Sequence, residues 1–379
     1  MMGHITQRLV LEVTNEEDYP FDYFDNYSYS LSNDTEPAVP CEREEELQAF
    51  YAVFQPLVYS LMFLLGMLGN GVMLAILLRR QARLHGTEIY LFHLALADLL
   101  LLFTFPFSVT EVTMGWIFGD ILCKVLGMLS KVNFFCGVLL LACISFERYL
   151  AVVHAVRTLR GGRHPQSVHL TCFAVWLLSI TLSTPHAAFL SVAGDGNDSI
   201  RLACHLYGHG IHDNNWLMAS RFLTHMVGFI LPLSMMSYCY TAVVLVLHRT
   251  QQKQRSLEKR RAVRLALVIT AVFCLCWLPY NITTLMDTLM MLNIISRGSC
   301  EELTQANMAL AVTKSLGYAH CCLNPLLYAF LGVRFRRELR VLSHAASCCW
   351  DSGSLSLAPV LRSQASSKIS VSEGDITTN

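Results

Sequence analysis

One acidic side chain stands out because its surroundings are almost entirely apolar. Asp98 is the only charged residue between Ile89 and Val109, and an acid held in such a setting is costly and functional by default. Three amides that also lie in apolar runs, Asn70, Asn133 and Asn324, are its expected hydrogen-bond partners. These residue types predict a buried polar network that can hold charge away from water.

Hydrolytic and metal chemistry find little support in the sequence. No Ser/His/Asp or paired-aspartate pattern recurs, and no group of His and Cys residues has the spacing of a zinc site. The adjacent Cys321 and Cys322 lie in an apolar run and are interpreted as small hydrophobic residues. We therefore predict that the chain is not an enzyme and that it has no metal site or organic cofactor.

Seven apolar runs must position these groups. A helical span needs about 20 apolar residues, and the runs do not alternate in polarity as barrel strands do. With 54% hydrophobic and 15% charged residues, the chain is a poor match for a water-soluble enzyme, a disordered chain or a nucleic-acid binder. We predict an all-α membrane protein, a bundle of seven transmembrane helices. The spans are Phe50–Leu78, Ile89–Val109, Ile121–Val153, Val168–Val192, Phe222–Leu247, Leu265–Met286 and Met308–Leu331.

Basic residues are distributed unevenly between the segments that join the spans. The odd-numbered segments hold thirteen basic residues against one acid, and the even-numbered segments hold two against six. Because basic loops stay in the cytoplasm, the N-terminus is expected outside the cell and the C-terminus inside, with the chain in the plasma membrane. The odd-numbered segments are 79–87, 154–166 and 249–264; the even-numbered ones are 112–120, 191–216 and 292–302.

The segment before the first span is strongly acidic. Residues 1–50 hold twelve acids against two basic residues, so residues 1–49 are predicted to be a disordered extracellular segment. A solvated tail and an acidic capture arm for a basic partner are both open; Tyr19, Tyr23 and Tyr27 would contact the partner and are candidates for sulfation. Glycosylation sequons on the predicted outer face begin at Asn26, Asn33 and Asn197, whereas the sequon at Asn281 lies inside the sixth span.

Four of the fourteen cysteines lie on the predicted outer side, where conditions are oxidising. These are Cys41, Cys123, Cys204 and Cys300, and four cysteines allow three pairings. Eight others lie within spans. Cys348 and Cys349, in the predicted cytoplasmic tail, are expected to be palmitoylated.

Short motifs in consecutive spans together resemble the rhodopsin-like (class A) G-protein-coupled receptors. A second set of features resembles the chemokine receptors within that class. The resemblance covers about residues 50–343, and it is specific because all the motifs occur in order and in the right spans. The first set is Gly69-Asn70, Leu94–Asp98, Glu147–Val153, Trp176, Pro232, Tyr240, Cys276–Pro279 and Asn324–Tyr328. The second set is Thr104–Pro106, Gly115–Gly119, His320–Pro325 and the four outer cysteines.

This resemblance implies a function and two disulfides. A basic C-X-C chemokine would bind outside, and a heterotrimeric G protein of the inhibitory class would be activated inside, driving calcium mobilisation and chemotaxis of lymphocytes. The implied cysteine pairs are Cys123–Cys204 and Cys41–Cys300. An atypical chemokine-scavenging receptor, another peptide-binding class A receptor and a transporter are the alternatives. An intact Arg148–Val152 speaks against the scavenger, and the lack of internal repeats against the transporter.

The resemblance also implies a two-state switch at the inner end of the third span. Arg148 is expected to pair with Glu147 in the inactive state and to meet the G protein once released. A local ion pair whose long side chain reaches the lipid interface is the alternative. The family usually has Asp at the position of Glu147, so the charge is kept. The other residues carried over as switch or coupling residues are Tyr149, Tyr240, Trp277, Pro279, Asn324, Pro325 and Tyr328.

Two further sites follow from the resemblance. The first is a sodium ion near Asp98, held with the three amides; Gly137 and Cys321 lack the hydroxyls that often complete such a site, so a hydrogen-bonded water network is the alternative. The second is an outer ligand pocket. There Glu111 and Asp287 fit the acids that meet a basic chemokine N-terminus, and Lys131 is placed with them.

The outer pocket also departs from the family. Lys314 stands where chemokine receptors commonly have Glu, and His186 stands at a position where an acid is also found in the family. A Lys314–Glu111 ion pair across the pocket is the resulting hypothesis.

The segment after the seventh span is expected to meet the membrane and regulatory partners. Residues 332–343 are basic and amphipathic, which predicts a short helix along the inner membrane surface, in contact with lipid. Residues 344–379 are predicted to be a disordered tail, whose serines include Ser363, Ser366 and Ser367. Phosphorylation of this tail by receptor kinases would recruit arrestin through added charge.

Overall fold

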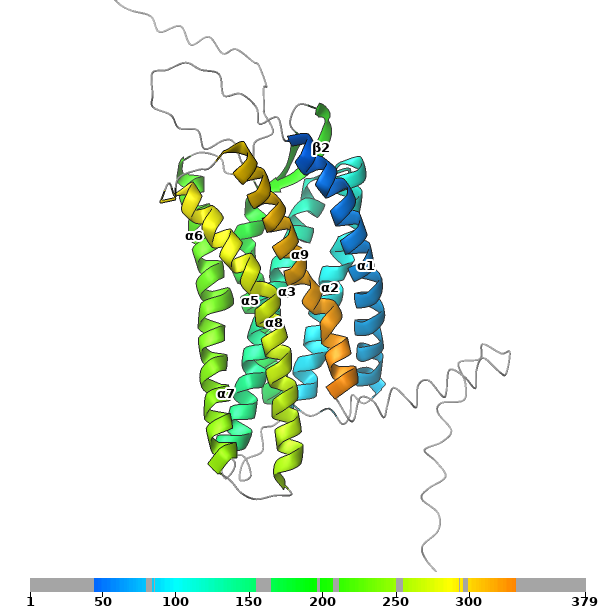
Figure 1. The fold of residues 1–379 in the computed structure, drawn as a ribbon. Coiled ribbons are helices and arrows are strands. Elements are labelled where there is room, and N and C mark those ends of the chain that lie inside the picture. Colours follow the sequence, from blue (N-terminus) through cyan, green and yellow to red (C-terminus); the bar gives the residue numbers. More distant parts are fainter. Residues whose placement is uncertain are drawn as a thin grey trace, which may run out of the picture. The chain divides into compact units, whose positions relative to one another are not determined.

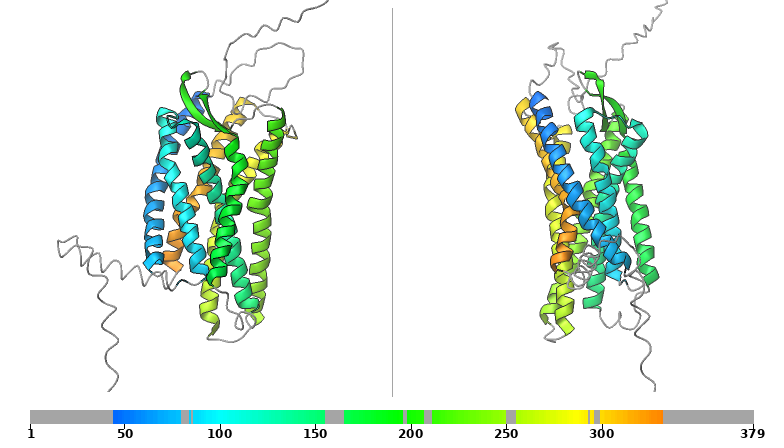
Figure 2. Two further views of the ribbon diagram at one scale, coloured as in Figure 1. Left: turned by 180° about the vertical axis from the view of Figure 1, so that it is seen from behind. Right: turned by 90° about the vertical axis from the view of Figure 1, so that its right-hand side faces the viewer.

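The computed structural model describes residues 44–79, 84, 86–154, 165–195, 198–206, 211–249, 255–292, 294–295 and 299–331. Seven helical segments within these residues run side by side as a bundle (Figures 1 and 2), which confirms the predicted fold class. They are α1 (Glu44–Arg79), α2 (Gly86–Met114), α3 (Gly119–Val153), α5 (Pro165–Ala188), the continuous segment α6 (Ile211–His225), η2 (Met226–Ile230) and α7 (Leu231–Arg249), α8 (Arg255–Met291) and α9 (Cys300–Leu331).

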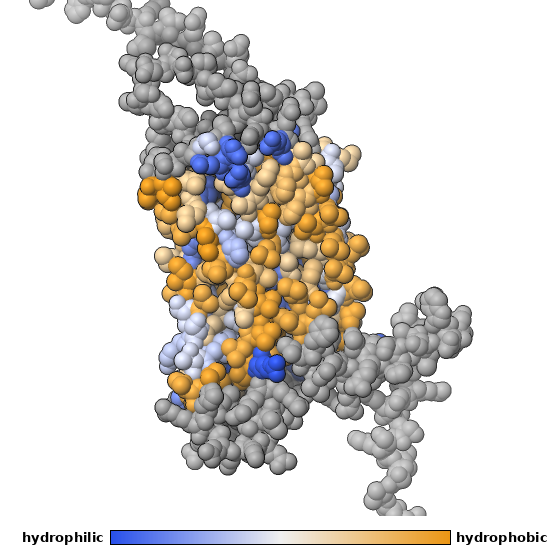
Figure 3. All heavy atoms as spheres, viewed as in Figure 1, coloured by the Kyte–Doolittle hydropathy of each residue, from blue (hydrophilic) through white to orange (hydrophobic). Residues whose placement is uncertain are grey.

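The face of the bundle seen in Figure 3 is made largely of apolar side chains. Leu68, Phe173 and Leu275 are each more than half exposed, and a surface so rich in apolar groups marks contact with something other than water. Among the described residues, six of the seven segments are long and apolar enough to cross a membrane. The chain is therefore a multi-pass membrane protein whose apolar surface faces lipid.

α9 is the one described helical segment that falls outside that group of six. It turns polar groups toward the interior: Asn307, Ser315, His320 and Asn324 are all buried. α9 packs against α1 and α8, and α3 lies centrally because it packs against α2, α5, α7 and α8. Polar residues of α2, α3, α8 and α9 therefore meet inside the bundle.

A β-hairpin that the sequence did not predict follows α5. The predicted fourth span runs to Val192, but α5 ends at Ala188 and β1 (Leu190–Asp195) begins two residues later. β1 pairs antiparallel with β2 (Asp198–Leu206), with Leu190 opposite Leu206 and Val192 opposite Cys204. Figures 1 and 2 show the hairpin at one end of the bundle, called the hairpin end below.

The hairpin is joined to α3 by a covalent bond. Cys123 and Cys204 form a disulfide with their Cα atoms 5.7 Å apart, which confirms one of the two implied pairs. Leu190 packs with Cys123 in a small hydrophobic cluster that includes Trp116. The backbone N–H of Trp116 donates to the carbonyl of Leu202 at 2.6 Å. The connection between α2 and α3 is thus hydrogen-bonded to β2 and packs against the hairpin.

The connection between α2 and α3 depends on two glycines. Gly115 and Gly119 have φ angles of 82° and 78°, a left-handed conformation that other residues adopt only with strain. These turns bring the indole of Trp116 back into the cluster, where its Nε1–H donates to the carbonyl of Gly119 at 2.9 Å. The Gly-Trp-x-Phe-Gly run is therefore a docking platform for the hairpin.

One turn of π-helix, η2, lies within the fifth helical segment just before Pro232. Proline has no N–H to donate to the carbonyl four residues earlier, and a widened turn is a common way to accommodate such a break. A Cβ added at Gly228, in η2, would lie 2.4 Å from a ring carbon of Phe134 on α3. η2 therefore allows an unusually close approach between the fifth segment and α3.

Several predicted features lie outside the described residues. They are Tyr19, Tyr23, Tyr27, Asn26, Asn33, Asn197, Cys41, Cys348, Cys349, the side chains of Cys300 and Tyr328, and residues 332–379.

Candidate ligand cavity and activation core

Asp98 lies at the centre of a buried hydrogen-bond network between α2, α3 and α9. Its side chain and those of Asn133 and Asn324 are almost fully buried. The amide of Asn133 donates to Oδ1 at 3.1 Å, and the amide of Asn324 donates to Oδ2 at 2.9 Å. Charge-assisted hydrogen bonds of this kind are about twice as strong as neutral ones. Two of the three expected partners therefore bind the carboxylate directly.

The third amide, Asn70 on α1, acts on the backbone of α9 instead. Its amide nitrogen donates to the carbonyl of Cys321 at 2.8 Å and to that of Gly66 at 3.0 Å. Asn70 is fully buried. It therefore ties α1 to the turn of α9 whose side chains surround Asp98.

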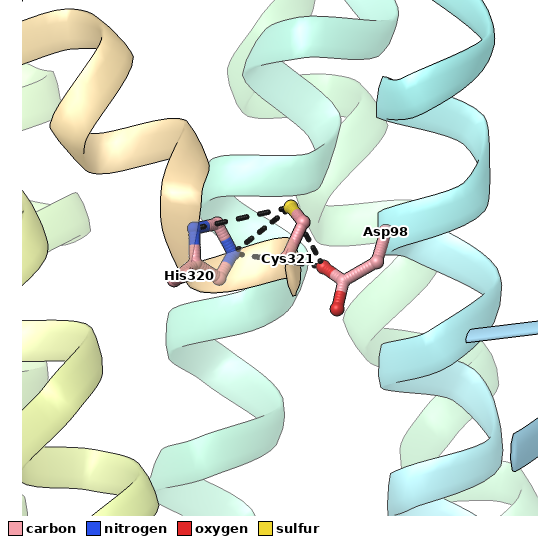
Figure 4. A group of neighbouring side chains, drawn as sticks. All are labelled: Asp98, His320 and Cys321. Atoms are coloured by element: carbon pink, nitrogen blue, oxygen red, sulfur yellow. Dashed lines mark hydrogen bonds and ion pairs between the residues drawn. The ribbon is translucent and has the colours of Figure 1, made fainter. Parts of the chain in front are cut away.

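Two residues of that turn join the network: His320, which was not expected there, and Cys321, which the family resemblance places near Asp98 but without a bonding role. Figure 4 shows His320 and Cys321 of α9 beside Asp98. The thiol of Cys321 donates to Oδ1 of Asp98 at 3.3 Å, and Nε2 of His320 lies 3.6 Å from the same oxygen. The interpretation of Cys321 as a hydrophobic residue is thus incomplete. Spacing along the chain cannot reveal this contact, because the acid belongs to another helix.

The same three side chains are the group of potential metal ligands found in the described part of the chain. One ligand atom from each of Asp98, His320 and Cys321 lies within 4.8 Å of the others. A thiol and an imidazole favour soft transition metals over Na⁺, Mg²⁺ or Ca²⁺. In the arrangement present, however, the amides and the thiol donate to the carboxylate, so the acid is stabilised by the protein itself.

Trp277 on α8 lies at the centre of an aromatic cluster that contacts the Asp98 network. Its ring centroid lies 4.6 Å from that of Phe134 on α3 and 5.8 Å from those of Tyr318 and His320 on α9. A Cβ added at Gly317 would lie 2.8 Å from the Trp277 ring. The indole is therefore enclosed by α3 and α9, and it contacts the Asp98 network through His320.

The backbone around Trp277 is also tied to the fifth segment. The side-chain amide of Asn281 donates to the carbonyl of Trp277 at 2.9 Å, and Nδ1 of His225 lies 3.0 Å from Oδ1 of Asn281. Asn281 is 7% exposed, which fits its interpretation as a sequon that carries no glycan. These bonds lie beside Pro279, which removes one backbone bond from α8.

At the opposite end of the bundle, a threonine connects Arg148 and Glu147. Nη2 of Arg148 donates to the hydroxyl of Thr87 on α2, and this hydroxyl donates to Oε2 of Glu147 at 3.0 Å. Within the described residues, Arg148 and Glu147 form no direct ion pair, and the Thr87 hydroxyl bridges the two side chains instead. Thr87 was not singled out from the sequence, where a threonine near a helix start is unremarkable.

Tyr240 on α7 links α3 and α8 near the same end. The hydroxyl of Ser145 donates to the Tyr240 hydroxyl at 2.9 Å, and the hydroxyl of Thr270 lies 3.2 Å from it. All three side chains are buried. Tyr149 packs at the surface instead, with its ring centroid 5.9 Å from that of Tyr238. Tyr240 therefore holds three helices together beside the Arg148 turn.

A cavity of about 860 Å³ lies at the hairpin end. Its lining includes all four of the described residues that the sequence predicted to contact a ligand, and Trp277 lines it as well. These four are Glu111, Lys131, Asp287 and Lys314. A pocket of this size is large enough for a drug-sized molecule or a peptide end.

The charges of the cavity are paired differently from the hypothesis. Oε1 of Glu111 accepts the backbone N–H of Cys204 at 2.7 Å, and Asp287 forms an ion pair with Arg221 at 2.6 Å. Lys314 has no ion pair within the described residues; its Nζ lies 5.9 Å from the centroid of the Tyr318 ring. The proposed Lys314–Glu111 pair is therefore not formed.

Comparison with known proteins identifies the family. The family described as 7 transmembrane receptor (rhodopsin family) matches residues 69–328. C-X-C chemokine receptor type 5 of Rattus norvegicus is 42% identical over 355 residues, or 93% of this chain and 92% of the relative. The chain belongs to the C-X-C chemokine receptors. Similarity is not confined to one type. Type 3 of Homo sapiens is 43% identical over 328 residues, covering 86% and 85% of the two chains. Type 2 of Pan troglodytes is 42% identical over 317 residues, covering 83% and 85%.

This membership confirms the class predicted from the motifs and places the receptor in a family without enzymatic activity. In the receptor, contacts run from the cavity through Trp277 to the Asp98 network, and separate contacts hold Arg148 at the opposite end.

Gly317→Ala is expected to destabilise the receptor by about 1–3 kcal/mol, because the added methyl forces the Trp277 ring out of its enclosed position. Thermal unfolding of the purified receptor in detergent measures the change. Gly71→Ala in α1 is the matched control, since nothing lies within 4 Å of its added Cβ. Equal melting temperatures for the two variants would mean that Trp277 has room to move.

Proposed function

We propose that this receptor binds a basic C-X-C chemokine outside the cell and activates an inhibitory-class heterotrimeric G protein inside. The observation that carries the proposal is that Trp277 both lines the cavity and contacts His320 of the Asp98 network. A ligand that displaces Trp277 would therefore change the packing between α8 and α9. Such a change is the two-state element that switching requires.

The proposed orientation places the hairpin end outside. It is supported by the basic residues in the odd-numbered connections, and it leaves the acidic residues 1–49 outside as well. In this arrangement Tyr19, Tyr23 and Tyr27 would meet the basic surface of the chemokine. Glu111, Lys131, Asp287 and Lys314 would then contact the segment that enters the cavity. Glycosylation at Asn26, Asn33 and Asn197 and a Cys41–Cys300 bridge belong to the same proposal.

The inner face is proposed to bind the G protein around Arg148, with Glu147, Tyr149, Tyr240 and Tyr328 as coupling residues. Residues 332–343 would lie on the membrane, anchored by palmitoyl groups on Cys348 and Cys349. The serine-rich tail would be phosphorylated by receptor kinases and recruit arrestin. These proposals follow from the sequence pattern and the predicted topology.

The finer assignment is to the type 5 receptor, with calcium mobilisation and chemotaxis in B-lymphocyte homing. It is supported by runs that resemble that type in Lys131–Cys136, Arg148–Val156, Ser220–Leu223 and Asp287–Leu289. The type 3 and type 2 receptors are about as identical to this chain as the type 5 receptors are. The panel of chemokines that tests the proposal should therefore include ligands of all three receptor types.

The surroundings of Asp98 offer a sodium ion few oxygen ligands. Two amide NH₂ groups and a thiol already donate to the carboxylate, and Gly137 and Cys321 offer no hydroxyl. The side-chain oxygen of Asn133 is buried without a hydrogen-bond partner, and it is the atom that would hold a cation or a water beside the acid. We propose that Asp98 joins helices through its hydrogen bonds.

A chemokine panel on cells that express the full chain tests the proposed function. At least one C-X-C chemokine should raise intracellular calcium, and pertussis toxin should abolish the response. Arg148→Ala should remove the response while it leaves binding of the same chemokine intact. Binding and internalisation without any calcium response in the unmodified receptor would favour the scavenging alternative. A receptor that neither binds nor responds to any chemokine would overturn the proposal.

Thr87→Val is expected to raise basal nucleotide exchange several-fold. The valine removes both the acceptor of Arg148 and the donor to Glu147, and one hydrogen bond to a charged group contributes about 1.5–3 kcal/mol. GTPγS binding to membranes without ligand, normalised to receptor number, measures the effect. Thr113→Val on the same helix is the control, because the Thr113 hydroxyl is exposed and bonds only to its own helix backbone. Equal basal exchange in the two variants would remove Thr87 from the latch.

A further inference from the structure

Two lysine side chains in the cavity have no acidic partner. Within the described residues, neither Lys131 on α3 nor Lys314 on α9 forms an ion pair, although both line the cavity. Nζ of Lys314 lies 5.9 Å from the centroid of the Tyr318 ring. An ammonium group in a confined site is costly unless an anion compensates its charge.

The carboxylates of the cavity are already engaged by other groups. Asp287 and Arg221 form an ion pair whose side chains are only 17% and 13% exposed. Glu111 accepts the amide of Cys204, next to the disulfide that fixes the hairpin. Releasing either acid would break a bond that supports the wall of the cavity. Both carboxylates of the lining therefore already have partners other than the two lysines.

The positive charges also converge. Lys131, Lys314 and Arg221 line the same cavity, together with Tyr280 and His186. The lining holds three basic residues against two acids, so its formal charge with neutral histidines is +1 (3 − 2). A confined site with this sign of charge concentrates anions.

The walls beside the lysines are aromatic. Tyr280, Tyr318, Trp277 and Phe134 all line the cavity. Aromatic faces favour an apolar or aromatic body, and lysines favour a charged end. The ligand chemistry that suits this combination is a carboxylate joined to an apolar group.

We propose that the cavity binds a carboxylate through Lys131 and Lys314, with the attached apolar group against the aromatic wall. The inference deepens the proposed function, on which it rests for the assignment of this cavity as the ligand site. A chemokine that is basic overall would then insert an acidic side chain, while its basic residues meet the acidic N-terminal segment. A free amphipathic acid would supply the same group.

Binding of a matched pair of small probes to the purified full chain in lipid nanodiscs tests this proposal. The probes are 4-phenylbutyrate and its neutral amide, 4-phenylbutyramide. We expect the acid to bind, as seen by ligand-observed NMR and a raised melting temperature, and the amide to bind at least tenfold more weakly. Lys131→Gln and Lys314→Gln should each weaken binding of the acid about 10- to 100-fold, the range for a charge-assisted hydrogen bond.

Lys124→Gln is the control variant. Lys124 lies on α3 like Lys131, but it pairs with Asp120 at 2.6 Å, is 41% exposed and does not line the cavity. It should bind the acid as the unmodified receptor does. Equal binding of acid and amide, or unchanged affinity in both lysine variants, would overturn the proposal.

Charge reversal separates loss of the site from loss of folding. Lys314→Glu should lose 4-phenylbutyrate and gain 4-phenylbutylamine, which a misfolded variant would not do. A Lys314→Glu variant that keeps the acid and ignores the amine contradicts the proposal. Two eight-residue peptides, one that contains Phe-Glu and one that contains Phe-Gln, identify the source of the carboxylate. Competition with 4-phenylbutyrate by the Phe-Glu peptide alone indicates a protein side chain. Binding of the small acid without competition by either peptide indicates a free acid. Because these measurements use no chemokine, a silent chemokine panel would overturn the proposed function without affecting them.

Discussion

Replacing Asp98 by leucine is expected to destabilise the receptor by about 3–5 kcal/mol, the typical effect of removing one partner from a buried charged network. The carboxylate accepts hydrogen bonds from Asn133, Asn324 and Cys321, and all of these groups stay buried when it is lost. Leucine has the same branched shape with bulkier methyl groups, so the loss reflects unsatisfied donors and crowding, not a cavity. Thermal or denaturant unfolding of the purified receptor in detergent measures the change.

Two further variants make this prediction specific. Asp98→Asn keeps one acceptor oxygen but turns an NH₂ group toward another donor, so its effect should be smaller, about 1–3 kcal/mol. Asp120→Asn removes an exposed acid that pairs with Lys124, and it should change stability by less than about 1 kcal/mol. If the Asp98→Leu and Asp120→Asn variants unfold at the same temperature or denaturant concentration, the network does not stabilise the bundle in the way its geometry implies.

The helices of this receptor could be predicted from the sequence because the bilayer imposes their length and apolar character. Their ends could not. Leu190 and Val192 are apolar and continue the fourth run, yet they belong to β1, and Leu190 packs against Cys123 and Trp116. Hydropathy indicates that such a side chain avoids water, but it does not tell whether the side chain contacts lipid or another part of the protein.

The candidate site, like the fold, could be predicted only in part from the sequence. Asp98 is recognisable because a lone acid in an apolar run needs an explanation. His320 and Thr87 are ordinary until α2, α3 and α9 come together, and Cys321 was placed near Asp98 only as a residue that lacks a hydroxyl. The hypothesis of a Lys314–Glu111 pair is wrong for a related reason. It considered opposite charges alone, and the hairpin that the sequence did not predict supplies the Cys204 amide to which Glu111 bonds.

Removing the disulfide with Cys123→Ala and Cys204→Ala together is expected to destabilise the receptor by up to about 4.5 kcal/mol. The bond joins residues 81 positions apart, and the chain-entropy relation gives about this value for such a loop. The bilayer already restricts the unfolded chain, so the measured effect should fall below that limit. Ligand binding should weaken as well, because the hairpin contributes Leu190, Ala203 and Cys204 to the cavity wall.

Reductant supplies the comparison that isolates the bond. Dithiothreitol should lower the melting temperature of the unmodified receptor by more than that of the double variant. A residual shift in the double variant is the expected sign of the proposed Cys41–Cys300 bridge, and adding Cys41→Ser and Cys300→Ser should abolish it. If the double variant instead melts like the unmodified receptor without reductant, the prediction fails. The Trp116–Leu202 bond and the small hydrophobic cluster would then be enough to hold the hairpin on α3.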